Sequence, residues 1–439
     1  MNNHRLLTGV LTALLLSGGV RAVGSNPEII TLEEIFQTAE TSSVQLRPSL
    51  SAVEEARRDI SVARSQRLPD IQASLSLSYI GDGFTAKRDL SDWQKAPIPH
   101  FGSGLSLNIT QPVYTGGAVT STIDMAGLKT TAARYAADFE RDNLRFRLAG
   151  FYLDLYKYAN LRTVVENNIR TAEKMLAEMK ARYEQGTALL NDITRYELLV
   201  SNLRLQLVKI TNTLDIFNNN LVETAGLPAG TVVLPDSTIL SRSLPVDGEG
   251  WWQDEATANS RAISLARTGV SISRKAEDLV RSEKLPKIGL QAGFSVDGPI
   301  LVEVPPINRT LGYWWVGVGV SYNIGSLYKS NRSLAKSRMA TQVATERLDA
   351  ESQRVQLSVH QDYIHYLEAY EELKTCRKSV ELAESNYNTV ATRYSADMAL
   401  ITDLLDAAGS KLDAEQQLVN AGINIIYYYY KLLFTSGKI

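Results

Sequence analysis

The sequence predicts an internally duplicated α+β membrane protein. Each chain would contribute four strands to a twelve-stranded β-barrel shared by three chains, and a long coiled-coil α-helical barrel would continue it. Three observations predict this fold. Residue matches recur at a constant separation, four segments alternate apolar and polar residues, and two very long segments carry a heptad pattern. These periodicities indicate a structural repeat, β-strands and coiled coils respectively.

The N-terminus has the pattern of a secretory signal peptide. His4 and Arg5 precede an apolar stretch over residues 6–16, and small residues follow up to Ala22. The apolar stretch is too short to span a bilayer, whereas a charged start, a short apolar core and small residues suit a signal peptidase. We therefore expect residues 1–22 to be removed and the mature chain to leave the cytoplasm.

Composition excludes several classes of protein. The only cysteine, Cys376, does not follow the expected cleavage position, which excludes a lipoprotein, an internal disulfide and a cysteine-based zinc framework. Removing the signal peptide takes away Arg5 and Arg21 and no acid, leaving 44 basic against 48 acidic residues and a net charge of −4. This charge argues against nucleic acid as a partner.

The chain contains one unit twice. Four matches occur at a separation of 211 residues, and Leu68-Pro69 matches Leu285-Pro286 at 217, because the intervening segment is six residues shorter in the second copy. The four matches are Tyr152 with Tyr363, Arg182-Tyr183 with Arg393-Tyr394, Leu189 with Leu400 and Asp192 with Asp403. We predict a first repeat over residues 23–227, a linker over 228–250 and a second repeat over 251–439.

Each copy contains two candidate strands. They cover residues 71–80, 104–114, 288–296 and 314–324. In the first strand, Leu75 and Leu77 alternate with Ser74 and Ser76, and a period of two indicates a sheet with one apolar and one polar face. Each segment has roughly the 9–11 residues that a tilted membrane strand requires.

Two features favour a membrane sheet over a small soluble sheet, which alternation alone would also permit. Trp314-Trp315 lies at one strand end, where an interfacial aromatic girdle would lie, and the loops over residues 82–101 and 297–312 are long and polar. No run of 18 or more apolar residues follows the signal peptide, so strands would have to cross the membrane.

A very long helix is predicted after each strand pair, over about residues 118–184 and 329–395. Such a helix would reach roughly 100 Å at 1.5 Å per residue. Apolar residues recur in alternating steps of four and three, interrupted only by Arg162 in the first copy and Asp362 in the second, and Cys376 is a small core residue of this seam. The first seam comprises Leu144, Leu148, Phe151, Leu155, Tyr158, Val165, Ile169, Ala172, Leu176, Met179 and Tyr183.

Four strands are too few to close a membrane barrel around a pore. Three chains would supply twelve strands, which is enough for an open lumen. The long helices would continue below the strands as a ring of coiled coils. The sequence therefore predicts a homotrimeric tube.

No catalytic or metal-binding constellation is present in the sequence. His360 and His365 are five residues apart and do not share a helix face at the i, i+4 spacing of a metal pair. Neither a phosphate-binding loop nor a nucleophile elbow occurs. We predict that the protein is not an enzyme and has no cofactor or metal.

Acidic residues at the turn between long and returning helices form the candidate functional site. Asp192 and Asp403 begin the returning helices and could cap them. Capping does not explain Asp406, whose counterpart in the first copy is Arg195. In a trimer, Asp403 and Asp406 would contribute six carboxylates to a ring that favours cations and binds multivalent ones. Gly186 belongs to the same tip.

Four short motifs occur in order along the mature chain. They are Leu68-Pro69, Gln111-Pro112-Val113-Tyr114-Thr115-Gly116-Gly117, Arg182-Tyr183-Glu184-Gln185-Gly186 and Thr402-Asp403-Leu404-Leu405-Asp406-Ala407. In this order, within a doubled sequence, they resemble the TolC family of outer-membrane efflux proteins. The resemblance implies a homotrimer with a twelve-stranded β-barrel, an α-barrel, and an equatorial layer built from the linker and the chain ends.

The resemblance also implies roles at the tip. Tyr394 would donate a hydrogen bond to Asp192 on a neighbouring helix pair and hold the tip shut until an adaptor opens it. Three features depart from the family pattern. The second copy has Tyr322-Asn323-Ile324-Gly325 where the first has its Gln-Pro motif. Ala399 stands where the family has a basic gate-locking residue, and Asp397 stands where a glycine is usual.

The sequence therefore predicts the exit duct of a tripartite efflux pump or type I secretion system, in the outer membrane with a periplasmic extension. The expected partners are two further copies of the chain, a periplasmic adaptor, an inner-membrane pump and outer-membrane lipid. The alternative is a periplasmic coiled-coil spacer or adhesin without a channel. That alternative explains the heptads but not the alternating strands.

Overall fold

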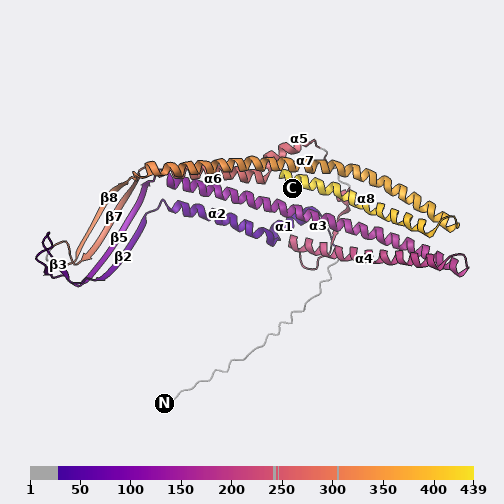
Figure 1. Ribbon diagram of the computed structural model, residues 1–439, viewed down its shortest axis with the longest axis horizontal. Helices are drawn as coiled ribbons and strands as arrows, with labels where there is room; N and C mark the ends of the chain where they lie inside the picture. The colour runs from indigo at the N-terminus through magenta and orange to yellow at the C-terminus, as the bar shows by residue number, and fades with distance from the viewer. Residues whose placement is uncertain (1–27, 241–243, 246, 304–305) are drawn as a thin grey trace, which may run out of the picture.

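The computed structural model describes residues 28–240, 244–245, 247–303 and 306–439 (Figure 1). A sheet lies at one end of the elongated molecule, and long helices run from it to the opposite end. The predicted signal peptide and its cleavage position lie outside the described residues. The predicted repeat boundaries stay a prediction.

Four strands form one antiparallel sheet in the order β2-β5-β7-β8. The strands are β2 (Asp70–Tyr79), β5 (Phe101–Tyr114), β7 (Lys287–Gly298) and β8 (Leu311–Ser321). Pairing of β5 with β7 joins the two copies, and β2 and β8 are the sheet edges among the described strands. A short hairpin of β3 (Gly83–Thr85) and β4 (Gln94–Ala96) lies in the loop between β2 and β5.

The register divides the sheet into an apolar and a polar face. Leu75 pairs with Leu105 on one face, and Ser74 pairs with Ser106 on the other, where their hydroxyls are 2.8 Å apart. The apolar face is largely uncovered in the single chain, since Leu75 is 71% exposed and Val318 is 67% exposed. Apolar side chains that face outward from a sheet suit contact with lipid.

The two tryptophans of the predicted aromatic girdle lie on opposite faces of the sheet, and the girdle itself stays a prediction. Strand β8 begins at Leu311, opposite Asp297, so the tryptophan pair lies within the strand rather than at its end. Because side chains alternate along a strand, Trp314 points to the apolar face and Trp315 to the polar face. The Trp315 ring lies over Gly293, where an added Cβ would come within 2.4 Å of Nε1. Only Trp314 can belong to an outward-facing girdle.

Two helices of 67 and 70 residues run the length of the helical part. Two shorter helices lie end to end along each long helix (Figure 1). Along α3, helix α2 is nearer the sheet and α4 is nearer the opposite end. Along α7, helix α6 is nearer the sheet and α8 is nearer the opposite end. These helices are α2 (Arg47–Ser65), α3 (Ala118–Glu184), α4 (Leu190–Ala225), α6 (Arg261–Ser282), α7 (Ser326–Ser395) and α8 (Ile401–Ser436). Because α3 also contacts α6 and α8, the helices form one wall whose edges are α2 and α4 on one side and α7 on the other.

Small elements surround the middle of this wall. They are β1 (Glu28–Ile30), α1 (Leu32–Ser42), the 3-10 helices η1 (Val44–Leu46) and η2 (Ser237–Leu240), β6 (Val233–Pro235) and α5 (Glu249–Asn259). Strand β1 pairs in parallel with β6, so the start of the first repeat joins the predicted linker. The predicted linker over residues 228–250 contributes β6 and η2 to this region, and its role as an equatorial layer stays a prediction.

The heptad seams pack as coiled-coil cores with two exceptions in the first copy. Leu148, Val165 and Ile169 are buried, as is Cys376 in the second copy. Tyr183 is 45% exposed because it lies in the last turn of α3, beyond the start of α4, and Arg162 turns away to Glu166. The position of Asp362 was predicted to interrupt the second seam, yet its side chain is buried.

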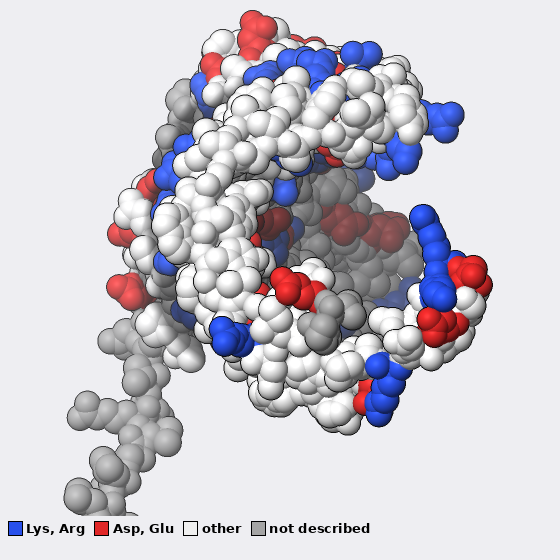
Figure 2. Space-filling view, turned by 90° about the vertical axis from the view of Figure 1, so that its left-hand side faces the viewer, with Lys and Arg blue, Asp and Glu red and all other residues white. Residues whose placement is uncertain are grey.

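Among the described residues, no helix is both long enough and apolar enough to cross a membrane. Viewed from the sheet end, the molecule curves around a hollow that is open along one side (Figure 2). A single chain therefore forms a curved wall that does not enclose a channel by itself.

Candidate gate at the helical tip

The tip consists of two turns with the same backbone hydrogen bonds. In the first, the Gly186 N–H donates to the Tyr183 carbonyl at 2.9 Å and the Thr187 N–H to the Arg182 carbonyl at 2.9 Å. In the second, the Asp397 and Met398 N–H groups donate in the same way at 3.0 and 2.8 Å. Gly186 and Asp397 both adopt positive φ, at 77° and 59°. The 211-residue repeat is therefore preserved down to the turn geometry.

A hydrogen bond links the two helix pairs at the tip. The Tyr394 hydroxyl on α7 donates to Asp192 Oδ2 on α4 at 3.3 Å. Asp192 does not cap α4, whose N-cap is Leu189 without a side-chain bond. Burial, followed by the negative charge of Asp192, raises the pKa of Tyr394 to about 12, so its hydroxyl remains a donor at neutral pH.

An apolar cluster supports this hydrogen bond. Tyr196, Tyr387 and Leu404 are buried around Tyr394, and together they bring α4, α7 and α8 into contact. Burial is also the main cause that raises the pKa of Tyr196. The tip hydrogen bond is therefore partly shielded from bulk water.

The carboxylates of the predicted ring lie on one face of α8. Asp403 Oδ2 accepts a hydrogen bond from the Leu400 N–H at 3.0 Å, so the capping interpretation holds for Asp403. Asp406 and Arg195 are exposed. The single chain brings Asp403 and Asp406 onto adjacent turns, and the six-membered ring stays a prediction.

Sequence reasoning missed one contact between the two turns. Arg182, in the last turn of α3, forms an ion pair with Asp397 and donates to the carbonyls of Ser395 and Tyr394 at 3.3 and 3.4 Å. The sequence did contain a signal, because the repeat aligns Asp397 with Gly186. An aspartate at a turn position where glycine fits best indicates that its side chain has a role.

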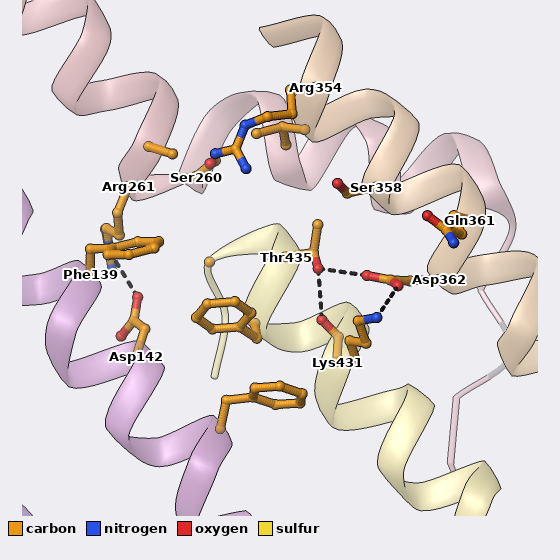
Figure 3. A pocket seen from close by; sticks show the side chains of 15 residues that line it. Phe139, Asp142, Ser260, Arg261, Arg354, Ser358, Gln361, Asp362, Lys431 and Thr435 are labelled. Atoms are coloured by element: carbon orange, nitrogen blue, oxygen red, sulfur yellow. Dashed lines mark hydrogen bonds and ion pairs between the residues drawn. The ribbon is translucent and has the colours of Figure 1, made fainter. Parts of the chain in front are cut away.

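A second polar cluster lines a cavity of about 240 Å³ where the end of α8 meets the start of α6 (Figure 3). Lys431 Nζ lies 3.1 Å from Asp362, which also accepts from the Thr435 hydroxyl at 2.7 Å. Across the cavity, Arg261 Nε lies 3.3 Å from the buried Asp142. Burial raises the pKa of Asp142, and three nearby arginines, Arg261 foremost, oppose this effect. Since each buried carboxylate has a partner, we interpret this cluster as structural.

His360 and His365 are partly exposed and contact Glu249 and Glu368 respectively. Within the part of the chain that the structure describes, no group of three or more His, Cys, Asp or Glu side chains could hold a metal ion.

Comparison with known proteins defines the class of this protein. Residues 35–227 and 252–425 match the family described as outer membrane efflux protein. The outer membrane protein TolC of Escherichia coli strain K12 is 21% identical over 435 residues, which cover 96% of this chain and 84% of that protein. The outer membrane efflux protein BepC of Brucella suis is 20% identical over 434 residues, covering 98% and 90%.

Solved structures share the fold. The outer membrane protein VceC of Vibrio cholerae superposes with a TM-score of 0.74 at 14% identity, over 92% of this chain and 96% of that one. The fold is therefore that of an outer-membrane channel. The chain belongs to the outer membrane efflux protein family, and the predicted family, fold class and outer-membrane location are confirmed.

Proposed function

We propose that three copies of the chain close into a tube that serves as the exit duct of a tripartite efflux or secretion machine. The observation that carries this proposal is the distribution of exposed apolar side chains along the helical wall. The edge helices expose Leu50 and Val62 on α2, Leu198, Leu205, Val208 and Ile216 on α4, and Met339, Leu357, Ile364 and Leu382 on α7, among others.

The middle helices α3, α6 and α8 expose fewer large apolar side chains than the edge helices do. Within the described residues, α3, α6 and α8 expose only Phe139, Tyr183 and Leu265 among large apolar side chains. Exposed apolar residues at two opposite edges suit a head-to-tail contact between identical chains, and such contacts generate a ring when the rotation closes. Strands β2 and β8 lie on the same two edges, so the same contact would extend the sheet.

The exposed apolar residues on the two edges, α4 and α7, also lie at similar distances from the helical tip. Ile216 on α4 and Leu367 on α7 both lie about 40 Å from the tip at the rise of an α-helix. Three copies would place twelve strands around one lumen, which the polar sheet face would line. At the tip, Asp403 and Asp406 of three chains would form a ring of carboxylates, and the bond between Tyr394 and Asp192 would hold the helix pairs together.

The proposed partners are a periplasmic adaptor and an inner-membrane pump, and the family's description as an efflux protein supports them. The test is to purify the chain from outer membranes and analyse its assembly and its partners. We expect a heat-sensitive trimer that copurifies with an adaptor and a pump. A soluble periplasmic monomer would contradict the proposal.

A pair of matched variants tests the assembly. Leu205→Glu places a charge on the α4 edge, where Leu205 is 54% exposed, and should weaken the trimer because the charge would be buried between copies. Leu265→Glu, at a 38% exposed leucine on the middle helix α6, should leave the trimer intact. Equal effects of the two variants would show that the trimer contacts lie elsewhere.

A further inference from the structure

We propose that the cavity between the start of α6 and the end of α8 is a binding site for a small aryl carboxylate, an organic anion with one negative charge and one aromatic ring. The site is independent of the proposed exit duct, because every residue that lines the cavity belongs to one chain. The ion pairs of Asp142 and Asp362 hold the walls of the cavity. They do not account for its unpaired hydrogen-bond donors or for its aromatic wall.

Ser260 is the first unpaired group in the lining. It is the N-cap of α6 and only 5% exposed, yet its hydroxyl makes no hydrogen bond to any residue that the structure describes. A serine at an N-cap ordinarily accepts a bond from the first turn of its helix. Because α6 has 22 residues and no side-chain cap, its first N–H groups carry a partial positive charge. A buried hydroxyl without a partner, beside such a helix end, suits an anionic oxygen of a ligand.

Two arginines add further donors to the same cavity. Arg261 donates to Asp142 through Nε alone, and Arg354 donates to Glu351 through Nε and one terminal nitrogen. Among the described residues, the remaining guanidinium nitrogens have no partner. The guanidinium of Arg354 points toward Ser260 in Figure 3. The donors that are left over are therefore close enough together to serve one ligand group.

The charges of the lining favour a single negative charge on the ligand. Three cations and two carboxylates line the cavity, which leaves one positive charge, and these residues are Arg261, Arg354, Lys431, Asp142 and Asp362. Both carboxylates already have partners. One bound carboxylate would offset the excess, and a guanidinium can bind it through two parallel hydrogen bonds. The two aspartates would repel an anion of higher charge more strongly.

Another wall of the cavity is aromatic. Phe434 of α8 lies with its ring centroid 5.9 Å from that of Phe139 and 5.1 Å from that of Phe146, both on α3. The cavity volume of about 240 Å³ suits a ligand with one ring better than a drug-sized molecule. A groove of about 920 Å³ adjoins it and shares Phe139 and Arg354, which gives a ligand a way in. An aryl carboxylate would place its ring on the phenylalanines and its carboxylate at the donors.

Benzoate is the probe, and calorimetric titration of the purified natural protein measures its binding. We expect one benzoate per chain, with a dissociation constant between about 10 µM and 1 mM for a ligand of about nine non-hydrogen atoms. Benzyl alcohol lacks the charge and acetate lacks the ring, so both should bind at least about tenfold more weakly. No binding of benzoate would overturn the proposal, as would happen if a neighbouring copy filled the cavity. Equal binding of benzyl alcohol or acetate would overturn the class of ligand.

Two pairs of variants locate the site. Ser260→Ala should weaken benzoate binding by about threefold to tenfold, and Arg354→Gln by about tenfold, because each removes a donor to the carboxylate. The matched controls are Ser264→Ala, one turn further along α6, and Arg332→Gln, on α7 and outside the cavity lining. Both controls should bind benzoate as the natural protein does. Controls that weaken binding as much as their counterparts would show that benzoate binds elsewhere.

Thermal unfolding separates a binding role of Ser260 from a structural one. Because its hydroxyl makes no capping bond, Ser260→Ala should unfold at the temperature of the natural protein when no ligand is present. The same concentration of benzoate should raise the unfolding temperature of the natural protein and of Ser264→Ala more than that of Ser260→Ala. A lower unfolding temperature of Ser260→Ala without ligand would show that the hydroxyl serves the helix, and its assignment to the site would be wrong.

Discussion

The two copies fill the same place in their coiled coils by different chemistry. Phe151 of α3 packs against Phe217 of α4, with ring centroids 6.5 Å apart. The equivalent of Phe151 in α7 is Asp362, which is buried and bound by Lys431 and Thr435 of α8. Asn220 and Thr224 occupy the corresponding positions in the first copy. The same helix packing therefore accommodates either an aromatic pair or an ion pair with a buried carboxylate.

The comparison shows that backbone geometry is shared while side-chain pairing differs between the copies. At the seam, a charge in one copy replaces an aromatic ring in the other. At the tip, an aspartate replaces a glycine. Both replacements bring a partner residue with them, Lys431 for Asp362 and Arg182 for Asp397. Paired changes of this kind maintain stability because an isolated buried charge or strained residue would reduce it.

The largest effect is expected from a charge in the seam of the first copy. Ile169→Asp would place an unpaired carboxylate among Val165, Ala172 and Tyr196, at a cost of several kcal/mol. The equivalent variant in the second copy, Val380→Asp, should cost less because Val380 is only partly buried. Thermal unfolding of the trimer measures both. Full trimer stability in Ile169→Asp would show that the heptad register is wrong.

The ion pair of the buried Asp362 with the partly exposed Lys431 gives the next largest effect. Asp362→Ala removes this ion pair and the hydrogen bond from Thr435, and should destabilise the protein by about 1–3 kcal/mol. The double variant Asp362→Phe, Lys431→Asn gives this site the residues of the first copy, Phe151 and Asn220. That double variant should lie within about 1.5 kcal/mol of the natural protein. A double variant as unstable as Asp362→Ala would mean that the two copies are not equivalent at this position.

The tip hydrogen bond should contribute less to stability. Tyr394→Phe deletes the donor to Asp192 and should destabilise the closed tip by about 1 kcal/mol, raising basal conductance in bilayer recordings. Tyr183→Phe is the matched control, because Tyr183 is the equivalent residue and is half exposed. Equal conductance of the two variants would place the closing contact elsewhere.

The pH dependence of this bond follows from the direction of its pKa shift. The pKa of Tyr394 is raised from 10 to about 12, so its stabilising contribution is complete below pH 10 and is lost as the pH rises through about 12. We therefore expect the conductance difference between the natural protein and Tyr394→Phe to be constant between about pH 7 and pH 10. A difference that disappears near neutral pH would contradict the assigned donor.

The smallest effect on stability is expected from the carboxylate ring. Asp403→Ala with Asp406→Ala should leave trimer assembly intact, apart from about 0.5 kcal/mol for the lost hydrogen bond from the Leu400 N–H to Asp403. It should lower cation selectivity and block by trivalent cations in bilayer recordings, because the local negative potential is removed. Unchanged selectivity and block would reduce these aspartates to helix caps.

The sequence alone determined the duplication, the strands and the long helices. The helix at residues 118–184 was predicted with its observed bounds, and the strand starting at Asp70 was predicted to within one residue. Local periodicity specifies such elements because the spacing of apolar residues along the chain decides whether they share one face of a helix or of a strand. The contact between Tyr394 and Asp192 came from family resemblance, and the structure contains that hydrogen bond.

Only the tertiary structure decided which side chains meet across the repeat. Trp315 lies over Gly293 because the register between β7 and β8 pairs these two residues, and strand pairing, not local sequence, sets that register. Asp362 is buried because Lys431, 69 residues further along the chain, lies beside it on α8. Arg182 meets Asp397 because the two hairpins pack together at their tips. These contacts join residues far apart in sequence, so no local pattern contains them.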